Sequence, residues 1–188
     1  MTEARSVVLL DVDGVLNALG NDLPPGKWSH GWATADGVSW PISWAPRVVD
    51  ALRSWHADGQ LELKWLTTWG HDANADLRRL LGLPELRVAG TYQDGRLRGV
   101  PTASSGSSHA AVTPAAPDPL SGLSWKYDVV CHLLADHPGR VIWVDDELHG
   151  PDSPFRAWAT LHDRLVVIGP DPSCGLTEHD LDAIGAIL

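Results

Sequence analysis

The sequence predicts an α/β fold, in which a mostly parallel β-sheet is covered by helices on both faces. Short apolar runs alternate along the chain with segments whose apolar residues recur at helical spacing. The first run, Val7–Leu10, is apolar at every position, which is typical of a parallel strand buried on both faces. The chain of 188 residues is long enough to bury a substantial core, and we expect a single domain over residues 1–188.

The expected strands and helices follow one another along most of the chain. Strands are expected at residues 7–10, 61–66, 86–90, 140–144 and 165–168. Helices are expected at residues 46–58, about 72–81, 125–134, 154–161 and 177–188. Pro46 suits the first position of a helix, and Gly82 suits the residue that ends one. Thr177, with Asp180 three residues later, suits an N-terminal capping box.

Residues 18–45, which follow the first strand, are rich in Gly, Pro and Trp. Asp36–Gly37 lies between two short runs of β-formers, which indicates a small hairpin with a tight turn. The segment is too short for a separate cap domain, so we expect a flap beside the end of the first strand. Four tryptophans of this segment are expected to pack it down onto the domain, with direct contact to a substrate as the alternative: Trp28, Trp32, Trp40 and Trp44.

Residues 91–124 form the least regular part of the chain, and we expect a long loop there. Residues 103–119 are rich in Ser, Ala, Gly and Pro, which is typical of a loop that is functional or mobile. A basic cluster precedes this stretch and consists of Arg78, Arg79, Arg87, Arg96 and Arg98. A solvated charged face and a rim that contacts phosphate are both compatible with this cluster.

The composition excludes several functional classes. The formal net charge of −10 argues against tight duplex binding, because that binding relies on a basic surface, but it leaves room for a small phosphorylated substrate. Cys131, Cys174 and the histidines lack metal-ligand spacing, so we expect no zinc site. The apolar run near the N-terminus is too short for a signal peptide or a membrane span, and we expect a cytoplasmic protein without a membrane partner.

Polar side chains follow several of the predicted strands. The first strand leads into Asp11 and Asp13, the second into Thr67–Thr68, and the fourth into Asp145–Asp146. The carboxyl ends of parallel strands meet at one edge of a sheet, so these residues are expected to converge there. Strand alternation would point Asp11 and Asp13 to the same side, unless the chain unwinds before Gly14. Lys126, at the start of a predicted helix, adds a cation.

These residues resemble the motifs of the haloacid dehalogenase-like (HAD) superfamily of phosphohydrolases. Asp11–Gly14 matches the D-x-D-G motif, Thr67 the Ser/Thr motif, Lys126 the lysine motif, and Asp145–Asp146 the acidic pair. The resemblance covers roughly residues 7–148. It implies a three-layer α/β/α Rossmann-like core with a minimal cap or a short flap.

A narrower resemblance lies within the same motifs. Asp11–Asn17, together with Thr67–Trp69 and Ala73–Asn74, resembles the HAD domain associated with Swiss Army Knife RNA repair proteins.

The resemblance implies a phosphomonoester hydrolase that acts through an aspartyl-phosphate. Asp11 would be the nucleophile, and Asp13 the acid and base. Mg²⁺ would be held by Asp11, by the main-chain carbonyl of Asp13, and by Asp145 or Asp146. The phosphoryl oxygens would be bound by Thr67, Thr68, Lys126 and the backbone N–H groups after Asp11, with that of Gly14 among them. Thr67, at the strand end, is the favoured donor, and Thr68 is then expected to bond locally.

Two other functions stay open. One is a polynucleotide 3′-phosphatase that repairs nucleic-acid ends, in which case the phosphorylated substrate is a nucleic-acid end rather than a small molecule. The other is a non-catalytic binding module on a HAD scaffold. The substrate and the oligomeric state are not predicted.

Overall fold

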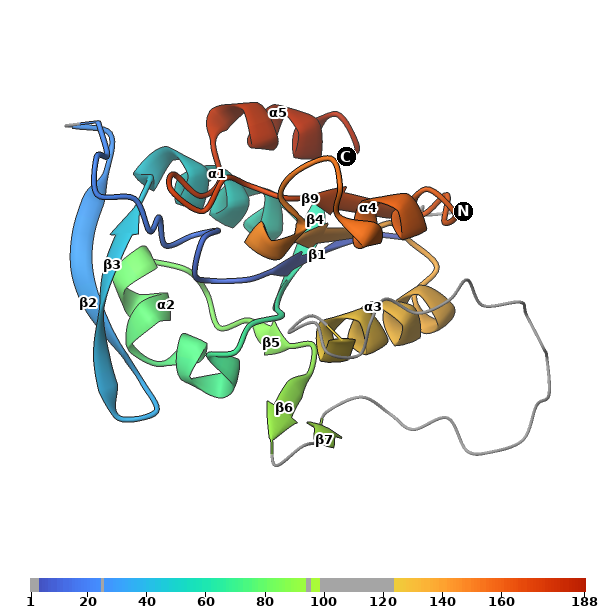
Figure 1. Ribbon diagram of the computed structural model, residues 1–188, viewed down its shortest axis with the longest axis horizontal. Helices are drawn as coiled ribbons and strands as arrows, with labels where there is room; N and C mark the ends of the chain where they lie inside the picture. The colour runs from blue at the N-terminus through green and yellow to red at the C-terminus, as the bar shows by residue number, and fades with distance from the viewer. Residues whose placement is uncertain (1–3, 25, 94–95, 99–123) are drawn as a thin grey trace.

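The computed structural model, described for residues 4–24, 26–93, 96–98 and 124–188, is built on a five-stranded sheet within these ranges (Figure 1). Its strands are β1 (Ser6–Leu10), β4 (Leu61–Trp65), β5 (Arg87–Val88), β8 (Val141–Val144) and β9 (Leu165–Ile168). The order across the sheet is β5-β4-β1-β8-β9, and each neighbouring pair is parallel. The predicted α/β fold with a parallel sheet is confirmed.

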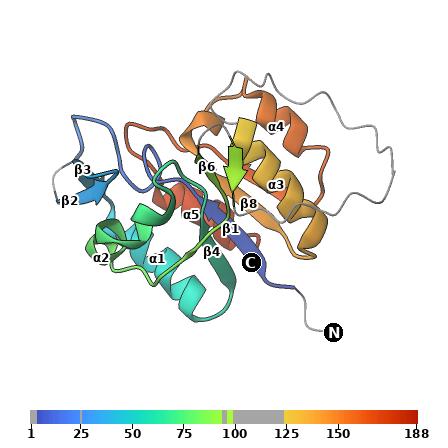
Figure 2. The same ribbon diagram turned by 90° about the horizontal axis from the view of Figure 1, so that it is seen from below.

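Helices cover both faces of this sheet. They are α1 (Pro46–Ala57), α2 (Asp76–Leu81), α3 (Ser124–Asp136), α4 (Pro154–Ala159) and α5 (Glu178–Gly185). Figure 2 shows α1, α2 and α5 on one side of the sheet and α3 and α4 on the other. The three-layer α/β/α core is therefore confirmed.

The central strand β1 supplies side chains to both layers. Val8 and Leu10 belong to the apolar cluster that contains residues of α1, α2 and α5. Val7 and Leu9 belong to the cluster that contains residues of α3 and α4. All four side chains have 0% exposure, which explains why the run is apolar at every position.

The predicted local signals at the helix ends are present. Pro46 begins α1, and Gly82 ends α2 in the left-handed conformation with φ of 67°. At α5, the Thr177 hydroxyl accepts a hydrogen bond from the Asp180 backbone N–H, and the Asp180 carboxylate accepts one from the Thr177 N–H. These ends depend on local chemistry, which is why the sequence predicts them well.

The single helix expected at about 72–81 is wrong. The structure has a 3₁₀-helix, η1 (Gly70–Asn74), which is separated from α2 by Ala75 with φ of −90° and ψ of −108°. The Asn74 side chain bonds both the N–H and the carbonyl of Leu86, at 3.0 and 2.7 Å, and accepts from Trp65 Nε1 at 3.0 Å. Because these bonds hold Asn74 toward the sheet, the chain turns before α2 begins.

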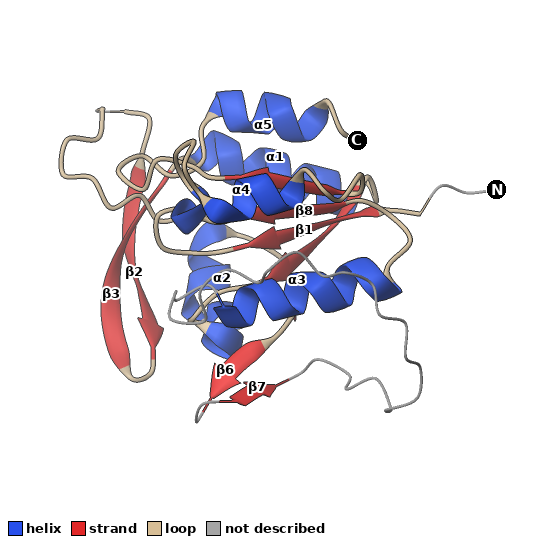
Figure 3. Cartoon of the chain, turned by 45° about the vertical axis from the view of Figure 1, so that its right-hand side comes forward, coloured by secondary structure: helices blue, strands red, loops and turns tan. Residues whose placement is uncertain are grey.

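The predicted hairpin is present as β2 (Ser29–Ala35) and β3 (Val38–Trp44), which pair antiparallel (Figure 3). Asp36 and Gly37 form the turn, with φ of 51° and 73°. Ala33, Ala35 and Ile42 are buried in the same apolar cluster as α2. One face of the hairpin therefore packs on the domain.

The expectation that all four tryptophans pack this segment down is wrong for two of them. Trp44 is half-buried against the core, and Trp28 is half-buried. Trp32 and Trp40 have 64% and 49% of their surface exposed. Trp32 follows strand alternation, because its neighbour Ala33 faces the core.

The segment expected to be irregular begins with two short antiparallel strands, β6 (Thr91–Gln93) and β7 (Arg96–Arg98). The rest of the expected loop, at 99–123, lies outside the described residues, as do 94–95. In the basic cluster, Arg96 and Arg98 lie in β7, and the side chains of Arg78, Arg79 and Arg87 are partly or fully exposed. None of the helices in the described part of the chain has the length and apolar character that a bilayer crossing requires.

Candidate active site

The polar residues that follow the strands gather at the carboxyl edge of the sheet. Asp11 follows β1, Thr67 follows β4 by two residues, and Asp145 follows β8. Lys126 enters from the first turn of α3. Their exposed fractions are 8%, 1%, 0% and 2% respectively, so polar groups from distant segments are buried together. A cluster of this kind requires internal partners, because buried charges without partners are costly.

Lys126 links two of the acids. Its Nζ donates to Asp11 Oδ2 and, at 2.6 Å, to Asp145 Oδ2. The ammonium also lies 5.9 Å from the centre of the Trp125 ring. Burial favours the neutral amine, but the charges of Asp11 and Asp145 outweigh it, and the pKa of Lys126 is raised. Lys126 is therefore a permanent cation of the site.

The site has more carboxyl groups than the single ammonium of Lys126 can neutralise. Burial raises the pKa of Asp145 to about 7 against the opposing effect of Lys126. Burial also raises the pKa of Asp146, and the Asp11 carboxylate adds to that rise. Within the described chain, Asp11, Asp145 and Asp146 each offer an oxygen, and these oxygens lie within 4.8 Å of one another. Three carboxylates around one ammonium fit a hard divalent cation such as Mg²⁺, which takes oxygen ligands and would remove the excess negative charge.

Gly14 makes room for Asp146. Its φ is +69°, and a Cβ atom at this position would lie 2.4 Å from Asp146 Cγ. The glycine is therefore required twice, by the left-handed backbone and by the close approach of the carboxylate. The resemblance assigns its backbone N–H to phosphate binding, but in the structure this N–H donates to the Asn17 carbonyl at 2.8 Å.

We expect Gly14→Ala to weaken Mg²⁺ binding by at least about tenfold, because the new methyl group displaces Asp146. Gly37→Ala is the matched control, since Gly37 has a similar φ of +73° and no atom within 4 Å of the position that a Cβ would take. Both variants carry a backbone strain of about 1–2 kcal/mol. Titration calorimetry with MgCl₂ gives the affinities, and equal affinity in the two variants would show that Asp146 is no ligand.

Asp13 has hydrogen-bond partners that differ from those of Asp11. The strand β1 ends at Leu10, and the chain turns so that the Val12 carbonyl accepts from the N–H groups of residues 15, 16 and 17. The Asp13 carboxylate accepts from Asn17 Nδ2 and from Trp69 Nε1, each at 2.8 Å. The chain has therefore unwound before Gly14, and the two acids have different partners. The assignment of Asp13 to the metal through its main-chain carbonyl stays a prediction.

Asn17 and Trp69 were not assigned a role from the sequence. Asn17 is 4% exposed, and its Oδ1 accepts from the Ser43 N–H of β3 at 2.9 Å. Its Nδ2 donates to the Asp13 carboxylate, so the Asn17 side chain connects the hairpin to Asp13. Asn17 lies four residues after Asp13, in the turn that contains Gly14, and this spacing is a weak local signal of a contact between the two side chains. Trp69 had no such signal, because its contact joins residues that are 56 positions apart.

The two threonines differ in burial. Thr67 is 1% exposed, and its Oγ1 accepts from the Trp69 N–H at 3.3 Å, which leaves its O–H able to donate. Thr68 is exposed. The local hydrogen bond was expected on Thr68, but the one observed is made by Thr67, because the chain turns into η1 directly after β4.

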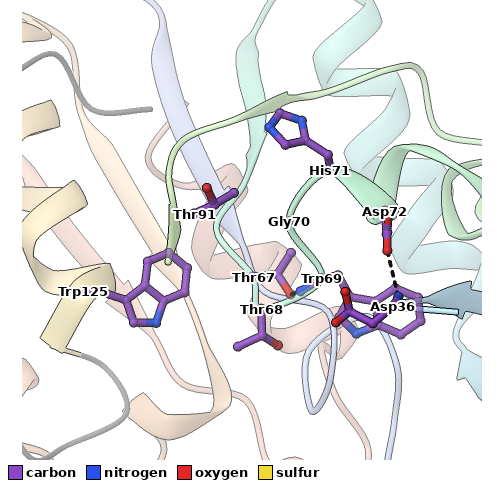
Figure 4. A pocket seen from close by; sticks show the side chains of 9 residues that line it. All are labelled: Asp36, Thr67, Thr68, Trp69, Gly70, His71, Asp72, Thr91 and Trp125. Carbon is purple, nitrogen blue, oxygen red and sulfur yellow. Dashed lines mark hydrogen bonds between the residues drawn. The ribbon is translucent and has the colours of Figure 1, made fainter. Parts of the chain in front are cut away.

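A pocket of about 350 Å³ lies beside Thr67 (Figure 4). Trp125, which precedes Lys126, lies on one side of it, and Asp36 and Asp72 lie on the other. Trp69, the donor to Asp13, also contributes to its lining. The pocket therefore adjoins the residues that surround the buried acids.

Comparison with known families supports this arrangement of motifs. A family model described as the HAD domain in Swiss Army Knife RNA repair proteins matches residues 7–181. A search among curated proteins found no match to this chain. The family match covers most of the sequence, including every strand of the central sheet and all the acids of the site. The chain therefore belongs to the HAD domains found in Swiss Army Knife RNA repair proteins.

Proposed function

We propose that this protein is a Mg²⁺-dependent phosphomonoester hydrolase that acts through an aspartyl-phosphate. The observation that supports it best is the buried Lys126, which joins Asp11 to Asp145 beside Asp146. This arrangement combines a carboxylate nucleophile, a fixed cation and a set of metal ligands in one buried place. HAD membership supports the same chemistry.

The proposed reaction consists of two displacements at phosphorus, with Asp11 as the nucleophile and Asp13 as the acid and base. In the first, an Asp11 oxygen forms a bond to phosphorus while the bond to the leaving oxygen breaks, and Asp13 gives that oxygen a proton. In the second, Asp13 takes a proton from water, and the water oxygen attacks phosphorus to release Asp11 and inorganic phosphate. The hydrogen bonds from Asn17 and Trp69 hold the Asp13 carboxylate in place for both transfers.

The remaining site residues are proposed to bind the metal ion and the phosphoryl group. Asp11, Asp145 and Asp146 would hold Mg²⁺, which supplies charge stabilisation to the phosphoryl group when bound. Lys126 keeps the acids close together and, with the Thr67 hydroxyl, donates to phosphoryl oxygens. Thr68 is a further proposed donor.

The direct test is phosphate release from 4-nitrophenyl phosphate. We expect turnover in the presence of MgCl₂ and its loss in EDTA, with recovery when MgCl₂ is added back. Turnover that is unchanged in EDTA would contradict the metal assignment. If neither this ester nor a panel of phosphorylated metabolites and oligonucleotides is hydrolysed, the protein is a binding module on a HAD scaffold. The full set of acids argues against that last outcome, because a binding module has little use for Asp13.

A second candidate function is the removal of a 3′-phosphate from RNA or DNA. The family description, which names RNA repair proteins, favours it. The net charge of −10 weighs against tight duplex binding but not against recognition of a single end. Activity on a 3′-phosphorylated oligonucleotide is compared with activity on nucleoside monophosphates. A preference for the mononucleotide would exclude end repair.

A further inference from the structure

The pocket beside Thr67 adjoins the point at which the leaving group would depart. Thr67, proposed to bind the phosphoryl group, lines this pocket. Trp69 lines it as well and donates to Asp13, the proposed proton donor to the leaving oxygen. A group bonded to the leaving oxygen would therefore lie next to the pocket. Figure 4 shows Thr67 near its centre.

The polar lining of the pocket is acidic and rich in hydroxyl groups. Asp36 and Asp72 contribute carboxylates, and Thr68 and Thr91 contribute hydroxyls. Neither Lys nor Arg occurs among its described lining residues, where His71 is the basic side chain. Carboxylates accept hydrogen bonds from hydroxyl and amino groups but repel other anions. The lining is therefore suited to a neutral group that carries hydroxyls.

The hairpin holds one of these acids in position. The Asp36 N–H, at the tip of β2–β3, donates to Asp72 Oδ2 at 2.8 Å, as the dashed line in Figure 4 shows. This bond fixes the tip beside η1. The volume of about 350 Å³ lies near the lower end of ordinary ligand pockets, so it suits one small group, such as a sugar ring, rather than several nucleotides.

We propose that this pocket binds the leaving group of the phosphomonoester and selects uncharged, hydroxyl-bearing groups over anionic ones. The sugar of a terminal nucleotide belongs to the preferred class. A leaving group with its own carboxylate would face the carboxylates of Asp36 and Asp72. This proposal rests on the proposed hydrolase function and adds the chemical class of its substrate.

Two esters of the same skeleton test the selection. Glycerol 2-phosphate and 2-phosphoglycerate differ only in that a hydroxymethyl group of the first is a carboxylate in the second. We expect the wild type to have the higher kcat/KM on glycerol 2-phosphate. In the double variant Asp36→Asn with Asp72→Asn, the ratio of the two kcat/KM values should fall by roughly tenfold, since two nearby charges are removed.

These substitutions preserve the local structure. Asparagine tolerates the positive φ of 51° at position 36. An amide oxygen at position 72 can still accept from the backbone N–H of the hairpin tip. The control is Asp163→Asn with Asp182→Asn, which removes two exposed carboxylates elsewhere and should leave the ratio unchanged.

The outcomes separate the two proposals. If the wild type hydrolyses both esters, but the ratio is the same in the wild type and in the Asp36→Asn/Asp72→Asn variant, the pocket assignment is overturned while the hydrolase function stands. A wild-type preference for 2-phosphoglycerate over glycerol 2-phosphate would likewise overturn the pocket assignment and leave the hydrolase function standing. If the wild type hydrolyses no phosphoester with MgCl₂ present, the hydrolase function itself fails.

Discussion

Replacing Asp11 by asparagine is expected to abolish phosphate release from 4-nitrophenyl phosphate, with a loss on the order of a thousandfold or more. An amide cannot act as the nucleophile, so no bond to phosphorus forms.

Replacing Asp13 by asparagine should lower kcat by about 10²–10⁴-fold, because the general acid and base is lost. Since 4-nitrophenol leaves without a proton, Asp13→Asn should still form the aspartyl-phosphate and then release phosphate slowly.

The two variants therefore differ in a transient signal. Stopped-flow absorbance should show a burst of one 4-nitrophenol per site for Asp13→Asn and no burst for Asp11→Asn. Asp182→Asn, on the exposed face of α5, serves as the control and should resemble the wild type. Each oxygen of Asp13 accepts from a donor, so its amide variant loses one hydrogen bond, and thermal unfolding checks that it stays folded. Equal activity of Asp11→Asn and the wild type would refute the assigned nucleophile.

Lys126→Met should destabilise the metal-free protein by about 3–5 kcal/mol at neutral pH, since breaking a buried ion pair leaves uncompensated charge. Methionine has a similar length and fills the buried position, so the lost ammonium is the main change. Asp11 and Asp145, which both bond Lys126, would then face each other without a cation. Urea unfolding in EDTA measures the free energy of unfolding. Phosphate release with MgCl₂ should also fall, by about 10²–10³-fold, because a phosphoryl donor is removed.

The pH dependence of this variant has a definite sign. Burial raises the pKa of Asp145, and Lys126 opposes that rise, so the pKa should rise further once the ammonium is gone. Between about pH 4, the ordinary value for Asp, and the raised value, the folded state holds a proton that the unfolded state has released. The free energy of unfolding of Lys126→Met should therefore fall as the pH rises through this window.

Lys64→Met is the matched control. The Lys64–Glu62 pair is 3.7 Å long and more exposed than the Lys126 pairs, so its loss should cost less than about 1 kcal/mol. A Lys126→Met variant that is as stable as Lys64→Met in EDTA at pH 8 would contradict the assigned role of the buried cation.

The layers of this protein and the sheet edge that carries its acids follow from local patterns in the amino-acid sequence. A continuous apolar run predicts a strand buried on both faces, and the side chains of Val7–Leu10 in β1 are fully buried. Parallel strands align their carboxyl ends, so the sequence alone predicts that Asp11, Thr67 and Asp145 converge. Helix ends at Gly82 and Thr177 followed because glycine geometry and capping act within a few residues.

The contacts between these side chains depend on how distant segments pack together. Trp69 reaches Asp13 across 56 residues, and Asn17 reaches Ser43 across 26, and neither separation leaves a periodic pattern in the sequence. The break at Ala75 arises because the neighbouring Asn74 bonds Leu86, a partner beyond α2. The acidic pocket exists because a hairpin tip meets η1 through Asp36. Local propensity sets each element, but packing among distant segments sets the environment of each side chain, and that environment determines what Asp11 and Asp13 can do.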